Sequence, residues 1–192
     1  MKEVKIQALL NKYVDNPRDC DNNFWLGYEY EKSKQYAAAL SYYLRCAELT
    51  TDRDLQYECL LKTWLMIHNL GNREWYEHKQ LLTAITQHPK RPEAYFLLSI
   101  YHEGKQEWKE SYYYSNVGLE LCDFTLPSLR TYVNYPGNFG LLFQKALSSW
   151  YVGQRELSKQ LWIQLSKRTD LYGDYSRLTK KNLKDFNIVE DK

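Results

Sequence analysis

The chain has 192 residues, of which 26 are basic and 24 acidic, so its net charge is only +2. A chain of this length forms one ordinary domain or one short array of repeats, and it buries about 70% of its unfolded surface on folding. The near balance of charge gives no reason to expect nucleic acid as a partner.

No run of about 18 apolar residues occurs in the sequence, so no membrane insertion is expected. Residues 1–14 mix charged and apolar side chains and contain no continuous apolar segment of signal-peptide length. We therefore expect a cytoplasmic protein.

Apolar residues recur with helical spacing along almost the whole chain. Over residues 4–14 they return every three or four positions, which predicts a helix that ends at Asn16 and Pro17. Patterns typical of strands and hairpin turns are scarce. The sequence therefore predicts an all-α fold. Further helices are predicted at about residues 22–33, 36–50, 54–70, 73–88, 92–104, 107–121, 139–152, 155–168 and 176–187.

The helical pattern is interrupted between residues 122 and 138. The stretch FTLPSLRTYVNYPGN contains two prolines and a Pro-Gly pair, which predicts a long connection with turns inside it. We expect a single domain over residues 1–192, with an N-terminal helix, helix pairs and a C-terminal helix at about 176–187 that caps the array. The pairs are predicted at about residues 22–50, 54–88, 92–121 and 139–168.

The first helix pair has the spacing of a known repeat. Leu26 and Gly27 are followed by Tyr30, and Ala39 is followed four residues later by Tyr43. This spacing resembles the L-G-x2-Y…A-x3-F pattern of a tetratricopeptide repeat (TPR), with Tyr in place of Phe. Asn23 and Thr51 depart from the pattern, which has Trp and Pro at these positions.

The pattern of the second helix returns 72 residues further along the chain. An aromatic residue and two small residues recur in the same register, since Tyr36, Ala39 and Cys46 correspond to Trp108, Ser111 and Gly118. Small residues allow two helices to cross closely, and each pair leaves an apolar face that only a neighbouring pair covers. The sequence therefore predicts an α-solenoid of about four TPR-like helix pairs.

The stretch from about Asn22 to Arg168 also resembles, as a whole, the TPR-like segment that accompanies family 2 glycosyltransferases of polysaccharide and glycan assembly. The resemblance is carried by AALSYYLRCAELTTDRDLQYECLLKTWLMIHNLG, RPEAYFLLSIYHEGKQEWKESYYYSNVGLEL and NFGLLFQKALSSWYVGQREL. It implies that the chain is associated with a glycosyltransferase system, either as a free-standing protein or as a piece of it.

Catalytic motifs do not accompany this resemblance. Asp52-Arg53-Asp54 has the Asp-x-Asp spelling of a metal-dependent transferase, but no βαβ pattern surrounds it, and acidic residues are favoured at the start of a helix. The four histidines are scattered, and the four cysteines form no CxxC pair. We therefore expect a protein that is not an enzyme, binds no metal and needs no cofactor, with reduced and mostly buried thiols.

The expected functional surface is the concave groove of the array. In a TPR fold the first helix of each pair lines this groove, and residues three and four apart contact an extended peptide or a partner helix. The alternative is that these residues pack against the N-terminal helix, the long connection or the last helix. By register, the partner-binding residues are Phe24, Tyr28, Glu31, Lys62, Met66, Asn69, Phe96, Ile100 and Glu103, and a fourth pair would add Phe143, Leu147 and Trp150.

Three functions fit these features. The first is a noncatalytic interaction module or scaffold for a protein partner, with a glycosyltransferase or another component of glycan assembly as a candidate. The second is direct binding of a glycan or nucleotide sugar by the Tyr-rich face. The third is a structural protein that self-associates through the open ends of its array.

Overall fold

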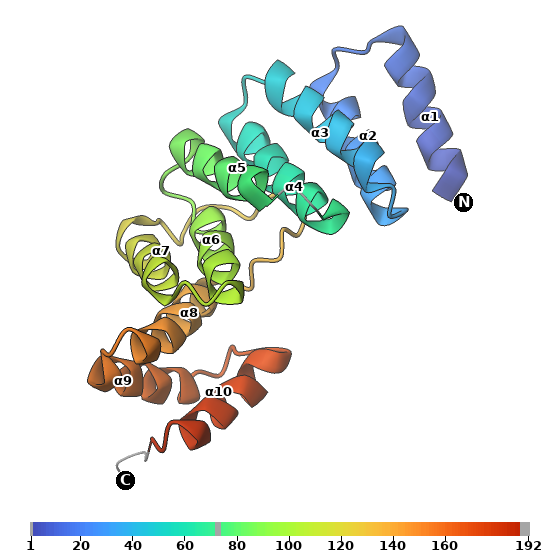
Figure 1. The fold of residues 1–192 in the computed structure, drawn as a ribbon. Helices are drawn as coiled ribbons and strands as arrows, with labels where there is room; N and C mark the ends of the chain where they lie inside the picture. The colour runs from blue at the N-terminus through green and yellow to red at the C-terminus, as the bar shows by residue number, and fades with distance from the viewer. Residues whose placement is uncertain (1, 72–73, 189–192) are drawn as a thin grey trace. The chain divides into compact units, whose positions relative to one another are not determined.

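The computed structural model describes residues 2–71 and 74–188, and this part of the chain is helical without any strand (Figure 1). The predicted all-α helical-repeat fold is confirmed, because consecutive helices pack as neighbours. The chain divides into two compact units. Unit 1 comprises residues 1–89 and 127–133, and unit 2 comprises residues 90–126 and 134–192.

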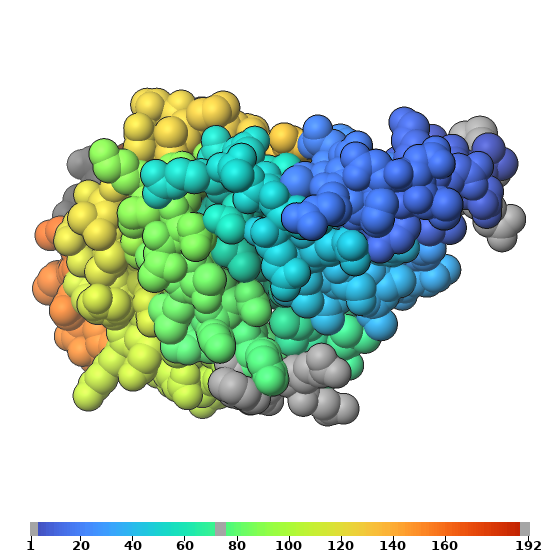
Figure 2. Space-filling view, turned by 90° about the horizontal axis from the view of Figure 1, so that it is seen from above, coloured from blue at the N-terminus to red at the C-terminus, as the bar shows by residue number. Residues whose placement is uncertain are grey.

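Unit 1 contains five of the helices in the described residues. Within the unit, α1 packs against α2, α2 against α3, α3 against α4, and α4 against α5. Figure 2 shows α1 in dark blue against the lighter blue of the helices that follow it. The helices are α1 (Lys2–Asp15), α2 (Cys20–Lys32), α3 (Tyr36–Leu49), α4 (Arg53–Leu70) and α5 (Glu74–Gln87).

Unit 2 contains the other helices of the described residues. Each of them packs against its successor within the unit, and α6 also packs against α8. All ends lie within about two residues of the predicted ones, which is the usual spread of helix ends. The helices are α6 (Glu93–Gly104), α7 (Trp108–Leu121), α8 (Asn138–Tyr151), α9 (Arg155–Ser166) and α10 (Asp174–Asp185).

The turns within three of the helix pairs have the same backbone geometry. Lys34, Gln106 and Gly153 occupy the same repeat position, and their φ angles are 59°, 59° and 87°. In each turn the next amide donates to the carbonyl five residues earlier, with an N–O distance of 2.9 Å. A residue with positive φ followed by this hydrogen bond is the usual C-terminal capping motif of an α-helix, in which a residue in the left-handed conformation ends the helix. The shared geometry supports the repeat register that the sequence predicted.

Close helix crossings explain the small residues of the repeat. A Cβ atom added to Gly27 of α2 would lie 2.9 Å from ring carbons of Tyr43 on α3. Around this crossing Phe24, Ala39 and Tyr43 form a buried cluster with residues of α3 and α4. Asn23, which replaces the Trp of the repeat pattern, is buried and donates from Nδ2 to the carbonyls of Pro17 and Asp19. It therefore anchors the loop that precedes α2.

The core of unit 2 has the same construction. A Cβ atom added to Gly118 of α7 would lie 2.8 Å from Cβ of Tyr95 on α6 and 3.1 Å from Cδ1 of Leu141 on α8. Three helices therefore meet at this glycine. A second cluster, which includes Phe143 of α8 and Trp162 of α9, is covered by side chains of α10.

We expect Gly118→Ala to lower the free energy of unfolding by about 1–3 kcal/mol, because the added methyl group overpacks the crossing of three helices. Gly104→Ala is the matched control, since no atom lies within 4 Å of its added Cβ. That variant should be neutral or about 0.4–1 kcal/mol more stable. Urea unfolding followed by circular dichroism measures both effects, and equal stability of the two variants would contradict the packing described for α7.

Candidate functional site

Residues 127–133, which we name the strap, form an irregular segment that bends at Arg130 and Thr131 and passes alongside α4 in unit 1 (Figure 1). They belong to the long connection predicted between residues 122 and 138. We name the residues of unit 1 that hold the strap the strap site, which consists of Asp21, Phe24, Asp52, Glu58 and Lys62.

Glu58 of α4 binds the backbone of the strap. Its side chain is only 1% exposed. Oε2 accepts the amide of Arg130 at 2.8 Å, and Oε1 accepts the amide and the hydroxyl of Thr131 at 2.7 and 2.6 Å. A buried carboxylate is stable only when hydrogen-bond donors replace its water. The strap supplies three such donors to this carboxylate.

Lys62 lies one turn after Glu58 on α4 and binds the strap from the same face. Its side chain is 2% exposed, and Nζ donates to the carbonyl of Tyr132 at 2.9 Å and to Oε1 of Glu31 at 3.0 Å. Oε2 of Glu31 accepts the Tyr43 hydroxyl at 2.6 Å. This chain of polar groups links α2, α3 and α4 to the strap, and the neighbouring carboxylate balances the buried ammonium group.

Arg130 of the strap is bound by two carboxylates from different helices. Its Nη1 lies 2.5 Å from Asp21 of α2, its Nη2 lies 3.5 Å from Asp52, and its guanidinium carbon lies 5.8 Å from the ring centre of Phe24. The hydrogen bond with Asp21 raises the pKa of Arg130. The carboxylates are 67% and 53% exposed, so each ion pair alone contributes little stability. The two carboxylates nevertheless fix the position of a guanidinium group that contacts both of them.

Asp52 also caps α4, as its sequence context predicted. Its Oδ1 accepts the amides of Asp54 and Leu55, at 2.9 and 3.2 Å, which are orphan donors at the start of the helix. The capping bonds orient the carboxylate, and its other oxygen faces Arg130.

Four of the predicted partner-binding residues meet around the strap. Phe24 lies beneath Arg130, while Glu31 and Lys62 form an ion pair. The ammonium group of Lys62 lies 5.8 Å from the ring centre of Tyr28. In unit 1, therefore, part of the surface predicted for a partner packs against the long connection, through Phe24 and Lys62, as in the alternative that the sequence left open.

The other predicted residues of unit 1 lie elsewhere on α4. Met66 is fully buried in the core cluster with Cys59. Asn69 is exposed and donates from its side chain to the Leu65 carbonyl of its own helix. These contacts are made within unit 1 away from the strap, so the strap site extends over only part of the predicted surface of α4.

The predicted residues of unit 2 are covered within that unit. Phe96 is buried and contacts the ring of Tyr135, whereas Ile100 is half-buried. Glu103 accepts a hydrogen bond from Nε2 of Gln144 at 2.8 Å, and burial raises its pKa. On α8, the three residues of the fourth pair contact the cluster or the segment that contains α10, as shown by Phe143 with Tyr175, Trp150 with Phe186, and Leu147 against the cluster.

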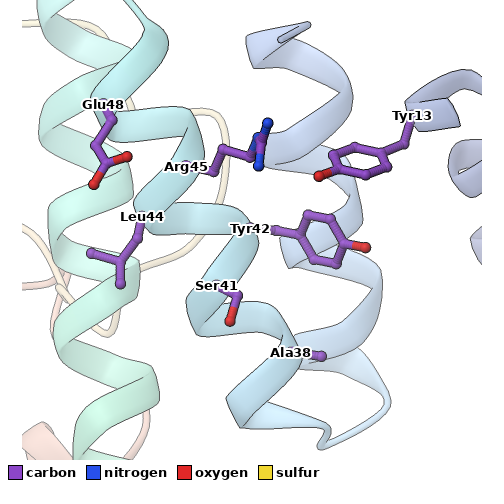
Figure 3. A pocket seen from close by; sticks show the side chains of 7 residues that line it. All are labelled: Tyr13, Ala38, Ser41, Tyr42, Leu44, Arg45 and Glu48. Carbon is purple, nitrogen blue, oxygen red and sulfur yellow. The ribbon is translucent and has the colours of Figure 1, made fainter. Parts of the chain in front are cut away.

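A separate open pocket of about 440 Å³ lies beside α1 and α3 in unit 1 (Figure 3). Tyr13 contacts the ring of Tyr42 edge-on, with ring centres 5.6 Å apart, and Arg45 lies over the ring of Tyr13. Tyr42 also stacks on Tyr30. These contacts occupy ring faces and attach α1 to the first helix pair, so we assign the aromatic side chains a structural role. The remaining lining residues are Ala38, Ser41, Leu44 and Glu48.

Asp21, Glu58 and the strap residues were not predicted from the sequence as functional candidates. A signal for Glu58 was present, because Glu58 and Lys62 are four residues apart in the otherwise apolar stretch CLLKTWLMI that follows the glutamate. Charged residues on the apolar face of a helix require partners. The strap itself has no periodicity that would indicate where it binds.

The described residues contain no group of three or more His, Cys, Asp or Glu side chains arranged to hold a metal ion. Within the same residues, no helix combines the length and the apolar character needed to span a membrane. Four cysteines lie in this part of the chain, all as free thiols. Comparison with known proteins gives no further guide, because the chain matches no family model and no curated protein.

We expect Glu58→Gln to loosen the strap. The glutamine amide group would face a backbone N–H donor, and the charge that strengthens the three hydrogen bonds would be lost, at a cost of about 1.5–3 kcal/mol. Hydrogen exchange measured by NMR at the amides of Arg130 and Thr131 should therefore become at least about tenfold faster. Glu48→Gln, at an exposed carboxylate on α3, is the control and should leave both amides unchanged. Equal protection in both variants would show that Glu58 does not hold the strap.

Glu103→Gln should stabilise unit 2 at neutral pH. Burial raises the pKa of Glu103 above its ordinary value of 4.5, so the folded state binds this proton more tightly than the unfolded state. Ionisation of Glu103 therefore costs stability as the pH rises above 4.5, and glutamine avoids this cost while its oxygen still accepts from Gln144. Melting temperatures measured between about pH 4 and pH 7 should converge at the acidic end. If the difference in melting temperature between the variant and the wild type did not change with pH, the ionisation of Glu103 would not be its cause.

Proposed function

We propose that this chain is a noncatalytic protein-interaction module, or scaffold, whose strap site binds a bent, irregular segment of a partner protein. The observation that carries the proposal is the way in which the strap is held. Two buried charged side chains, Glu58 and Lys62, bind two amides and one carbonyl of the strap backbone. A surface that binds the main-chain groups of consecutive residues in this manner accepts a polypeptide segment with the same bend as its ligand.

The charged groups of the strap site support a binding role over a catalytic one. Glu58 accepts three hydrogen bonds from the strap, and Lys62 is engaged by Glu31 and by a strap carbonyl. These contacts position a polypeptide and fix its register. The proposal therefore assigns both residues to binding, with no chemical step.

The candidate partner is a glycosyltransferase or another component of glycan assembly. This part of the proposal rests on the resemblance of residues 22–168 to the TPR-like segment that accompanies family 2 glycosyltransferases. The paired helices and the turns that share one geometry support the TPR-like assignment. The module would then bind a glycosyltransferase directly, or it would hold another glycan-assembly protein close to that enzyme.

Affinity capture from the cells that produce the chain tests this function. The bait is the full chain with Arg130→Ala and Thr131→Ala, which removes the side-chain contacts of the strap, so that the strap competes less well with a partner segment for the strap site. A second bait adds Glu58→Gln and Lys62→Met. We expect the first bait to enrich a glycosyltransferase or its associated proteins at least about tenfold over the second, since the second bait lacks the charged groups that bind the backbone of the ligand.

Circular dichroism and thermal melting must show that both baits are folded. Capture of the same proteins by both baits would place the partner surface elsewhere on the chain. Capture of no protein by the first bait would contradict the proposed function.

A further inference from the structure

Three consecutive strap residues are bound through four kinds of chemical group. Arg130 is bound through its guanidinium group and its amide, Thr131 through its amide and hydroxyl, and Tyr132 through its carbonyl. The carbonyl and amide contacts are possible for almost any residue. The guanidinium and hydroxyl contacts depend on the side chain, so these two positions determine which sequences fit.

The hydroxyl position is defined by Glu58. The Thr131 hydroxyl donates to Oε1 at 2.6 Å, a short distance typical of a hydroxyl bound to a charged carboxylate. Because Glu58 is 1% exposed, a ligand without a hydroxyl would remove a donor from a carboxylate that water does not readily reach. Threonine and serine supply this donor, whereas valine has the shape of threonine and lacks it.

The preceding position is defined by Asp21 and Asp52, which bind opposite arms of one guanidinium group. Nη1 of Arg130 lies 2.5 Å from Asp21, and Nη2 lies 3.5 Å from Asp52. A planar fork with donors on two nitrogens contacts both carboxylates at once, and its face lies over the ring of Phe24. The single ammonium group of lysine has no such fork. Arginine is therefore the side chain that this pair of carboxylates selects.

From these contacts we propose that the strap site is specific for a protein segment that bends as the strap does and in which an arginine is followed by threonine or serine. The strap is then a built-in competitor, which occupies the site until a partner segment displaces it. The inference rests on the proposed function, because it names the ligand chemistry of the same site. A tethered segment has an effective concentration in the millimolar range or above, so a free peptide competes poorly with an intact strap.

A fluorescent peptide with the sequence PSLRTYVN, which is that of residues 127–134, is the probe. Its binding to the full chain is measured by fluorescence anisotropy, with the wild type and with the Arg130→Ala/Thr131→Ala double variant. The double variant should bind the peptide at least about tenfold more tightly, because its own strap competes less well. Equal affinities of the two chains would overturn the role of the strap as a competitor.

Changes within the peptide test the specificity on the double variant. Replacement of the arginine by alanine, which removes both ion pairs and the contact with Phe24, or of the threonine by valine, should weaken binding about tenfold. Lysine in place of arginine keeps one ion pair and should weaken binding less than alanine does, and serine in place of threonine should cost less than about threefold. Peptides that all bind equally would overturn the specificity and leave the proposed function standing. Failure of every peptide to bind the folded double variant would contradict both the specificity and the binding of a partner segment at the strap site. If the double variant still captured a partner protein from cells, that partner would bind another surface of the chain.

Changes within the strap site separate the two positions. Asp21→Asn with Asp52→Asn should abolish the preference for arginine over alanine in the peptide and preserve the preference for threonine over valine. Glu58→Gln should abolish the preference for threonine over valine and preserve the preference for arginine over alanine. Both sets are made in the background of the double variant, with circular dichroism as the test of folding. Asp185→Asn, at an exposed residue of α10, is the charge-matched control and should alter neither preference. Preferences that survive in the site variants would overturn the assignment.

Discussion

A carboxylate that is almost completely withdrawn from water must receive hydrogen bonds from the protein, and Glu58 is such a group in unit 1. Its donors come from residues 72 and 73 positions further along the chain. The path of the strap follows from this requirement, since the two amides must point at the carboxylate together. Lys62 and its partner Glu31 extend the same polar contact to α2. The arrangement of α2, α4 and the strap thus depends on the charge of one side chain.

Much of the fold could be predicted from the sequence because its determinants are local. Helical spacing, turn residues and small residues at crossings act within about 30 residues of one another. The repeat position held by Lys34, Gln106 and Gly153 shows this, since three different residues adopt the same backbone geometry. Asn23 shows how a departure from the pattern is accommodated, because its amide ties down a loop where the repeat has Trp. The single domain expected over residues 1–192 stays a prediction.

The candidate site could be predicted only in part, for a physical reason. Tyr28 and Glu31 of α2 lie near Lys62 of α4, as their shared register in the repeat indicates, whereas their role in binding a partner stays a prediction. Register carries no information about an irregular segment that packs across the same surface, so the strap and its contacts to Glu58 went unpredicted. The partner, the link to glycan assembly and the noncatalytic role stay predictions on which the proposed function depends.

The position of the strap in the sequence also orders events during synthesis on the ribosome. All of the helices of unit 1 precede residue 90, whereas the strap is made only after α6 and α7. Until about 40 further residues have been added, Glu58 and Lys62 are present in a nascent unit without the segment that binds them. Contacts between residues so distant in sequence form slowly, and incomplete intermediates of this kind expose surface to other chains. The newly made protein therefore passes through a period in which its strap site is open.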